Sequence, residues 1–476
     1  MKKLIVILLL SPITLLGQEI NFDLLLDLLP DTNQVEEGFD TDRLPASFFA
    51  KNRQALRDSM PNNSVAVLFS SPVRNRSNDV DYEYHQDPNF YYLTGLTEPH
   101  AAIIIYKEDQ EFSDDLKTNE IIFLQKKDKR EEVWTGKRTG IEGAVRQLGI
   151  KTAMENAEFL SFENEYQNFD KVLFFETVDD VKNTKEKGDL FGLLQSFNAT
   201  TQNLTNTNTR DLHLIMASLR QIKSPEEIVL MRKAIEMTCD AQIELMKALK
   251  PEMTEYQSEA IVEYIFKKNG AEHPGFPTIM GGGKHSCIIH YSTNRKQLKN
   301  KELLVSDIGA EYHGYTADVT RTLPVNGKFS KEEAIIYSIV LKAQQAGIDS
   351  CKAGNKFWTP HNAATKIITD ELMALGIIEK RYHVQRYFMH GTSHYLGLDV
   401  HDAGLNGRLK PGNVITVEPG IYIPKGSKCD PKWWNIGIRI EDDILITKEG
   451  PENLSEKAPR KIEKIEALME QESSFE

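Results

Sequence analysis

Short apolar runs dominate the first half of the chain. Four of them are rich in β-branched or aromatic residues: SVAVLF (64–69), AAIIIY (101–106), EIIFLQ (120–125) and KVLFFE (171–176). Runs of this length and composition favour strands, and the longer stretches between them leave room for helices. We therefore predict an α/β domain over residues 40–205.

A polar stretch interrupts this pattern near the middle of the chain. NATTQNLTNTNTR (198–210) is rich in Asn and Thr and poor in apolar residues, so it predicts a loop near a domain boundary. We place a linker at residues 206–222.

A long helix is expected at the start of the second half, over residues 223–249. Ser224 is a suitable N-cap, Pro225 takes the first helical position, and Glu227 completes a capping box. Apolar residues recur at helical spacing and indicate core packing: Ile228, Met231, Ile235, Cys239, Ile243 and Met246. Strand-like and helical runs alternate beyond it, which predicts an α+β domain over residues 223–465.

The N-terminus has the pattern of an export signal. Lys2 and Lys3 precede an apolar run that is too short to span a bilayer, which needs about 20 residues. We expect residues 1–17 to be a signal peptide and the protein to be periplasmic or secreted. Leu15 is larger than the residue preferred before a cleavage site, so a retained interfacial anchor is the alternative; no stable membrane span is expected.

Composition narrows the classes of partner. The chain has 57 Lys and Arg against 70 Asp and Glu, a net charge of -13. Phosphate backbones are bound by basic faces, so no nucleic-acid partner is expected. The four cysteines lie far apart with no C-x-x-C pair, which excludes a thiol-rich metal site and leaves free thiols or a single disulfide open.

Four acids stand in or after apolar strand-like runs. Asp307 ends one run and Asp318 lies in the next, so a hairpin would place the two carboxylates side by side. Glu418 follows ITV, and alternation puts Glu441 with Arg439 on the face opposite three isoleucines. Like charges buried together require a cation or shifted pKa values.

A histidine cluster lies in the same half. HGTSHYLGLDVHDAG (390–404) holds His390, His394 and His401, and its glycines let the backbone approach a crowded site. Four carboxylates with an imidazole form a hard ligand set that suits divalent Mn, Co or Fe. Bridging carboxylates can hold two such ions about 3.5–4 Å apart.

These motifs resemble the pita-bread metallopeptidases, and most closely the Xaa-Pro aminopeptidases (aminopeptidase P). Asp307 and Asp318 are followed by HGTSHYLGLDVHD, TVEPGIYI and GIRIEDD. RNRSNDVDYEYHQDPNFYYLTGLTEP (74–99) and EEVWTGKRTG (131–140) are similar to the family's N-terminal domain. The resemblance implies a creatinase-like α/β domain followed by an α+β pita-bread catalytic domain. His85 stands where the family has Arg, which affects a domain contact.

The resemblance also implies the chemistry. It predicts a metallo-aminopeptidase that hydrolyses the bond before a penultimate proline, by a hydroxide held between two divalent ions, with Mn(II) the expected metal. The implied metal ligands are Asp307, Asp318, His394, Glu418 and Glu441. The implied catalytic residues are Glu418 as proton shuttle, His401 on the scissile carbonyl, His290 and His390 in the substrate pocket, and Arg439 beside the ligands. A homo-oligomer, dimer or tetramer, is expected.

Three alternatives stay open. Prolidases, which cut only Xaa-Pro dipeptides, resemble the same ligand pattern, but they tend to have Gly where this chain has Ser393. A non-catalytic pita-bread binding module, or metal-free creatinase-like hydrolysis, would lack the five ligands that are present here.

Other conspicuous residues have simpler interpretations. The aromatic run Phe90, Tyr91 and Tyr92 is expected to be strand packing. The remaining histidines of the second half are expected on the surface or at helix caps: His273, His285, His313, His361 and His383.

Overall fold

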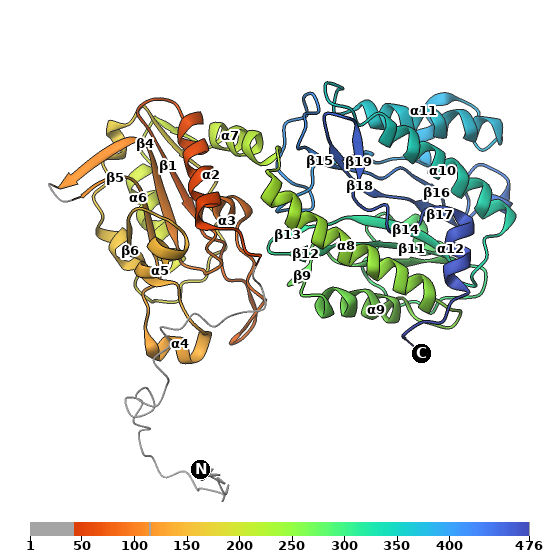
Figure 1. Cartoon of the computed structure of the whole chain (residues 1–476), viewed down its shortest axis with the longest axis horizontal. Helices are drawn as coiled ribbons and strands as arrows, with labels where there is room; N and C mark the ends of the chain where they lie inside the picture. The colour runs from red at the N-terminus through yellow and green to blue at the C-terminus, as the bar shows by residue number, and fades with distance from the viewer. Residues whose placement is uncertain (1–41, 114–115, 476) are drawn as a thin grey trace, which may run out of the picture.

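A computed structural model describes residues 42–113 and 116–475. The predicted signal peptide, residues 1–17, lies outside the described residues. Figure 1 shows two lobes, one drawn in red to yellow and the other in green to blue, joined through α7 and the start of α8. Among the described helices none is both long and apolar enough to cross a membrane.

The N-terminal lobe is built on a six-stranded sheet in the order β6-β5-β4-β1-β7-β8. Its strands are β1 (Ser64–Phe69), β4 (Ala102–Ser113), β5 (Leu116–Leu124), β6 (Ala153–Glu155), β7 (Lys171–Phe174) and β8 (Thr207–Asn208). The predicted strand at residues 64–69 coincides with β1, and the other three overlap β4, β5 and β7 with ends that differ by one or more residues, so strands at these four places are confirmed. A hairpin of β2 (Asn75–Ser77) and β3 (Val80–Asp81) lies outside the sheet.

Helices complete this lobe: α2 (Ala46–Ser59), α3 (Pro88–Thr94), α4 (Lys129–Thr135), α5 (Gly140–Gln147), α6 (Leu190–Thr201) and α7 (Arg210–Arg220). The expected strand at residues 90–92 is therefore wrong. Asp87 caps α3 by accepting a hydrogen bond from the Phe90 N–H, Pro88 occupies the first turn, and Gly95 ends the helix at φ 71°. The aromatic side chains still pack, because Phe90 and Tyr92 are buried.

The expected loop and linker are more ordered than predicted. Residues 198–201 form the last turn of α6, and the predicted linker, residues 206–222, contains β8 and α7. Leu212 and Met216 are buried at helical spacing on α7. Apolar contacts on one face therefore hold a helix where the polar composition predicted irregular chain.

The C-terminal lobe begins at α8 (Pro225–Ala248), whose predicted capping box is present. The Glu227 N–H donates to Ser224 Oγ at 3.3 Å, and the Ser224 N–H donates to Glu227 Oε2 at 2.8 Å. Along the predicted core stripe, Met231 and Ile235 are fully buried. The other helices are α9 (Glu255–Lys268), α10 (Lys331–Asp349), α11 (Thr359–Ala374) and α12 (Ile462–Met469).

Several small antiparallel sheets lie between α8 and α9 on one side and α10 and α11 on the other (Figure 1). One sheet is formed by β10 (Ile279–Gly282), β11 (Leu303–Ile308) and β14 (Val319–Pro324), and another by β9 (His273–Pro274), β12 (Ala310–Tyr312) and β13 (Tyr315–Thr316). A third is formed by β15 (Val414–Val417), β18 (Asp442–Ile446) and β19 (Pro451–Asn453), and β16 (Gly420–Ile423) pairs with β17 (Ile436–Arg439). Short 3₁₀ turns lie at Asn156–Ser161, Tyr166–Asn168, Gly283–Cys287, Arg381–Arg386 and Pro431–Trp433.

Histidines join the two lobes. His85 Nε2 lies 3.0 Å from Glu311 Oε1, so the position that departs from the family pattern still makes a domain contact. The prediction of a surface position for His313 is wrong. His313 is 8% exposed because Glu272 and Asp42 lie at its two ring nitrogens, at 2.9 and 3.3 Å.

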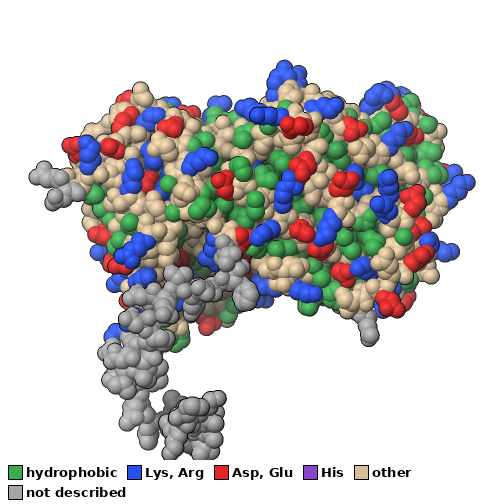
Figure 2. Space-filling model, in the orientation of Figure 1, with side chains coloured by type: hydrophobic (Ala, Val, Ile, Leu, Met, Phe, Trp, Pro, Cys, Tyr) green, Lys and Arg blue, Asp and Glu red, His purple; other side chains and the backbone are tan. Residues whose placement is uncertain are grey.

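The other histidines predicted to be peripheral are partly exposed: His273, His285, His361 and His383. All four cysteines are free thiols. On the face shown in Figure 2, basic and acidic side chains are interspersed rather than gathered into a patch of one sign.

Candidate metal centre

The first two acids of the site lie on paired strands. β11 and β14 run antiparallel, with Ile308 opposite Val319. Asp307 is the penultimate residue of β11, and Asp318 directly precedes β14. The pairing therefore brings the two carboxylates to the same end of the sheet, as the sequence predicted.

The histidine segment runs beside β15. The Thr416 N–H donates to the His394 carbonyl at 3.0 Å, and the Glu418 N–H donates to the Thr392 carbonyl at 2.9 Å. This irregular ladder places His394 next to Glu418, although the two are distant in the sequence. Glu441 joins them from the turn between β17 and β18, where its N–H donates to the Thr320 carbonyl at 3.1 Å.

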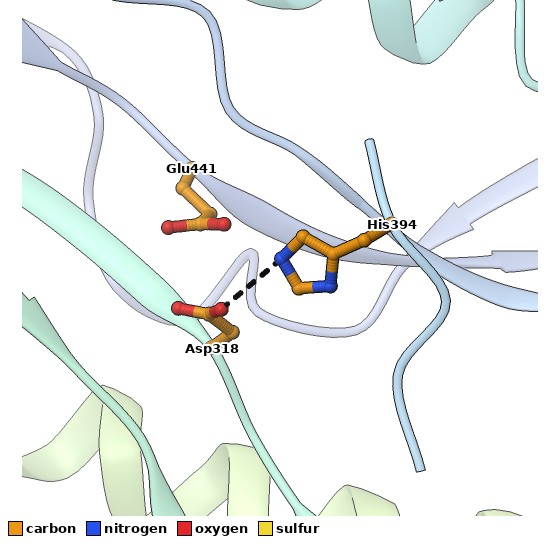
Figure 3. Close-up of side chains that lie close together, drawn as sticks. All are labelled: Asp318, His394 and Glu441. Atoms are coloured by element: carbon orange, nitrogen blue, oxygen red, sulfur yellow. Dashed lines mark ion pairs between the residues drawn. The ribbon is translucent and has the colours of Figure 1, made fainter. Parts of the chain in front are cut away.

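Three side chains converge closely enough to bind one ion. One ligand atom from each of Asp318, His394 and Glu441 lies within 4.8 Å of the others, and Figure 3 shows the two carboxylates and the imidazole facing one another. His394 Nε2 is 3.4 Å from Asp318 Oδ2 and 3.6 Å from Glu418 Oε1. No other such group of His, Cys, Asp or Glu occurs among residues 42–113 and 116–475.

The electrostatics of this cluster require positive charge. Burial and then the neighbouring carboxylates raise the pKa of Asp318 and the pKa of Glu441 well above their ordinary values. Burial also raises the pKa of Glu418 to about 7. Asp307 Oδ1 and Asp318 Oδ1 are buried and accept no hydrogen bond from the described residues. Unpaired buried carboxylate oxygens of this kind fit a bound divalent cation.

A cavity of about 250 Å³ opens beside the cluster. Its polar lining includes the five predicted metal ligands, Arg439, His290 and His401. Its apolar wall is formed by Phe276, Pro277, Ile279, Ile289 and Val400. A small apolar pocket that shares its lining with a group of metal-ligating residues is suited to holding a compact side chain against the reacting atoms.

Of the three histidines implied in catalysis, two border this cavity. His290 and His401 are exposed, and the His401 ring lies edge-on to the His394 ring, with centroids 4.5 Å apart. His390 does not border the cavity. Its Nε2 lies 2.9 Å from Tyr422 Oη and its Nδ1 lies 3.5 Å from Glu418 Oε2, so it reaches the site through Glu418.

Arg439 supports the ligands from behind. Its guanidinium, which is 2% exposed, pairs with Asp307 Oδ2 at 2.5 Å. It also donates to Tyr422 Oη at 2.9 Å and Thr320 Oγ1 at 3.1 Å. The group thus fixes the rotamer of a predicted ligand, as expected of a residue that orients metal-binding side chains.

Sequence reasoning missed two supporting residues. Thr320 Oγ1 donates to Glu441 Oε2 at 2.6 Å, and Asp443 Oδ2 accepts the Asp318 N–H at 3.1 Å. A signal for Asp443 was present, because three consecutive acids in the strand-like IEDDILI cannot all be solvent-facing. Thr320 carried no comparable signal.

Comparison with known proteins agrees with this geometry. Residues 49–174 match the aminopeptidase P N-terminal domain, and residues 229–448 match metallopeptidase family M24. The chain is 36% identical to the Xaa-Pro aminopeptidase of Escherichia coli (strain K12) over 88% of its own length and 97% of that protein.

Solved structures give the same result. The aminopeptidase PepP of Pseudomonas aeruginosa superposes with a TM-score of 0.80 at 33% identity, covering 90% of this chain and 98% of that one. Aminopeptidase P from E. coli with the inhibitor Pro-Leu has a TM-score of 0.79 at 34% identity, with the same coverage. The predicted fold, an α/β domain followed by an α+β pita-bread catalytic domain, is confirmed, and the chain belongs to metallopeptidase family M24.

Proposed function

We propose that this protein is a metallo-aminopeptidase that removes the first residue from peptides with proline in the second position. The observation that carries the proposal is the cavity in which an apolar wall faces the Asp318, His394 and Glu441 cluster. The similar proteins support this proposal. One is the Xaa-Pro aminopeptidase of E. coli, and the structure of E. coli aminopeptidase P was solved with the inhibitor Pro-Leu.

The residues present suit hydrolysis before a proline. Bound divalent ions would activate water and polarise the scissile carbonyl. Glu418, which borders the cavity beside the converging ligands, would accept a proton from the water and return it to the leaving nitrogen. That return is needed because the nitrogen keeps the electron pair of the broken C–N bond and must be protonated to leave as an amine. His401, exposed at the cavity, would hold the carbonyl oxygen.

The alternative, a strict dipeptidase, needs a cation for the free carboxylate of proline. Arg439 is the only Lys or Arg among the described residues that border the cavity, and it is engaged by Asp307 and Tyr422. Longer peptides do not make this demand. The lining therefore favours an aminopeptidase.

The substrate rule is tested by comparing three peptides with metal-loaded protein: Xaa-Pro, Xaa-Pro-Xaa and Xaa-Ala-Xaa. We expect release of a single amino acid from Xaa-Pro-Xaa and slow or no cleavage of the alanine peptide. Cleavage of the dipeptide alone would replace the proposal with prolidase activity. Equal cleavage of the alanine peptide would refute the proline rule.

We propose two ions per subunit, with Mn(II) as the working metal. Asp307 and Glu418 border the same cavity as the three converging ligands, and a hard carboxylate set suits Mn(II). Elemental analysis should return two metal equivalents, and Mn(II) should restore the chelated enzyme best among divalent ions. A fully active protein with one metal equivalent per subunit would contradict the proposal of two ions.

We also propose a homo-oligomer and export by residues 1–17. Exposed apolar side chains support the oligomer. Val133 and Trp134 on α4 are 51% and 76% exposed, and a subunit contact would remove this apolar surface from water. Light scattering that returned 54.2 kDa at micromolar concentration would exclude the oligomer.

Export predicts a mature N-terminus at Gln18 by mass spectrometry of secreted protein, and an uncleaved cytoplasmic product would exclude it.

A further inference from the structure

A buried carboxylate directly follows the carbonyl-binding histidine in the sequence. Asp402, 7% exposed, accepts hydrogen bonds from Arg220 through Oδ1 and from Lys223 Nζ through Oδ2, the latter at 2.7 Å. The two cationic side chains are also buried, at 5% and 1% exposure. Such an arrangement of one carboxylate and two cations is stable only while all members remain paired.

The two cations come from the connection between the lobes. Arg220 is the last residue of α7, and Lys223 lies just before α8. Arg220 Nη1 also donates to Asn89 Oδ1 on α3, at 2.8 Å, and Lys223 Nζ donates to the Arg220 carbonyl at 2.7 Å. Asp402 is therefore tied to both the N-terminal lobe and the connecting segment.

Backbone contacts hold Asp402 and its cations close to the loop that carries His401. A Cβ at Gly397 would lie 2.3 Å from Asp402 Oδ2 and 2.8 Å from Lys223 Nζ, so any larger residue there would displace this ion pair. The Asp402 N–H donates to the Tyr395 carbonyl at 2.9 Å. By contrast, the His401 side chain is exposed, and its backbone N–H is held at 3.0 Å by Asp399 Oδ1.

We infer that Asp402 is a positioning residue, which sets the place of His401 over the metal cluster through its pairs with Arg220 and Lys223. The inference rests on the proposed function of His401. Replacing Asp402 with Asn removes the charge that both cations require, and the loop carrying His401 then loses its anchor. A displacement of about 1 Å at a catalytic group can cost about 10²-fold in rate.

The test is a double-mutant cycle. Asp402→Asn should lower kcat for Xaa-Pro-Xaa by about 10²-fold with little change in KM and with normal metal content. In the His401→Ala background the same change should have almost no effect on kcat, because there is no longer an imidazole to position. An equal loss in both backgrounds would overturn the inference.

A matched control separates positioning from stability. Glu120 is also a buried carboxylate with two buried cations, Arg53 and Arg57, but it lies within the N-terminal lobe. Glu120→Gln should lower Tm comparably to Asp402→Asn while leaving kcat near the wild-type value. A kcat loss as large as that of Asp402→Asn would count against a specific role for Asp402.

Two further measurements remain decisive if Asp402→Asn folds poorly or if the peptide proposal fails. Arg220→Lys keeps the charge but cannot bridge Asn89 and Asp402, so it should reproduce part of the kcat loss. In zinc-loaded protein with ¹³C-labelled histidine, the ring signal of His401, identified by its loss in His401→Ala, should shift in Arg220→Lys. An unmoved signal would refute the inference, whereas a wild-type protein inactive on Xaa-Pro-Xaa would refute only the proposed function.

Discussion

Removing divalent metal with a chelator should destabilise the protein more at pH 8 than at pH 5.5. Without a cation, the buried carboxylates Asp318, Glu418 and Glu441 are most stable when protonated, because burial raises the pKa of each. Bound metal reverses this preference, since it binds the ionised carboxylates. The two forms should therefore diverge in stability as the pH rises.

The magnitude follows from Glu418, whose side chain is 18% exposed. Its pKa rises from 4.5 to about 7, so between these values the folded metal-free protein holds a proton that the unfolded chain releases. The free energy of unfolding of the metal-free form therefore falls as the pH rises from 5.5 to about 7, by roughly 2 kcal/mol over about 1.5 units at 1.36 kcal/mol per pKa unit. At about 2–4 °C per kcal/mol, this corresponds to roughly 4–8 °C in Tm between the two pH values.

The assay is thermal unfolding of metal-free and reloaded protein at both pH values and constant ionic strength. Titratable groups remote from the site affect the Tm of both forms equally, so they cancel when the two Tm values are subtracted. Glu418→Gln should reduce the pH dependence of the metal-free form, because the amide cannot titrate, while Asp318 and Glu441 still contribute. A Tm gap that is constant, or that narrows toward pH 8, would refute the interpretation of these carboxylates.

Three substitutions test individual roles. Asp318→Asn should lose bound metal together with activity, measured by elemental analysis of the purified variant; retention of the full metal complement would exclude Asp318 as a ligand. His401→Ala should lower kcat by about 10²–10³-fold with metal near its normal level, and an unchanged kcat would remove it from the reaction. Arg439→Lys cannot join Asp307 to Tyr422, so chelator competition should show metal affinity about 10–100-fold weaker, and unaltered affinity would contradict its supporting role.

The parts of the site that sequence could predict are those with strong local signals. A carboxylate at a strand end, as at Asp307 and Glu418, stands out because burial of charge is costly, and the glycine-rich histidine segment stands out by its composition. The strands β1, β4, β5 and β7 were predictable because each contains a short apolar run rich in β-branched or aromatic residues. The pairing of β11 with β14 was expected from the glycines between Asp307 and Asp318, although that segment is itself a hairpin of β12 and β13 that belongs to another sheet.

The parts that could not be predicted depend on contacts between distant segments. Arg220 and Asp402 are 182 residues apart, and neither lies in a pattern that indicates the other. His313 looked peripheral because its partners Glu272 and Asp42 belong to other segments. At α3, the cap at Asp87 and the left-handed Gly95 outweighed the strand preference of three consecutive aromatic residues.

The most direct test of the account is the product of one peptide, Xaa-Pro-Xaa, incubated with metal-stripped and with reloaded protein and analysed by mass spectrometry. The account predicts that only the reloaded protein releases the first amino acid, leaving a product that begins with proline. Equal activity in protein shown by elemental analysis to be free of metal would contradict it, as would release of Xaa-Pro as a dipeptide.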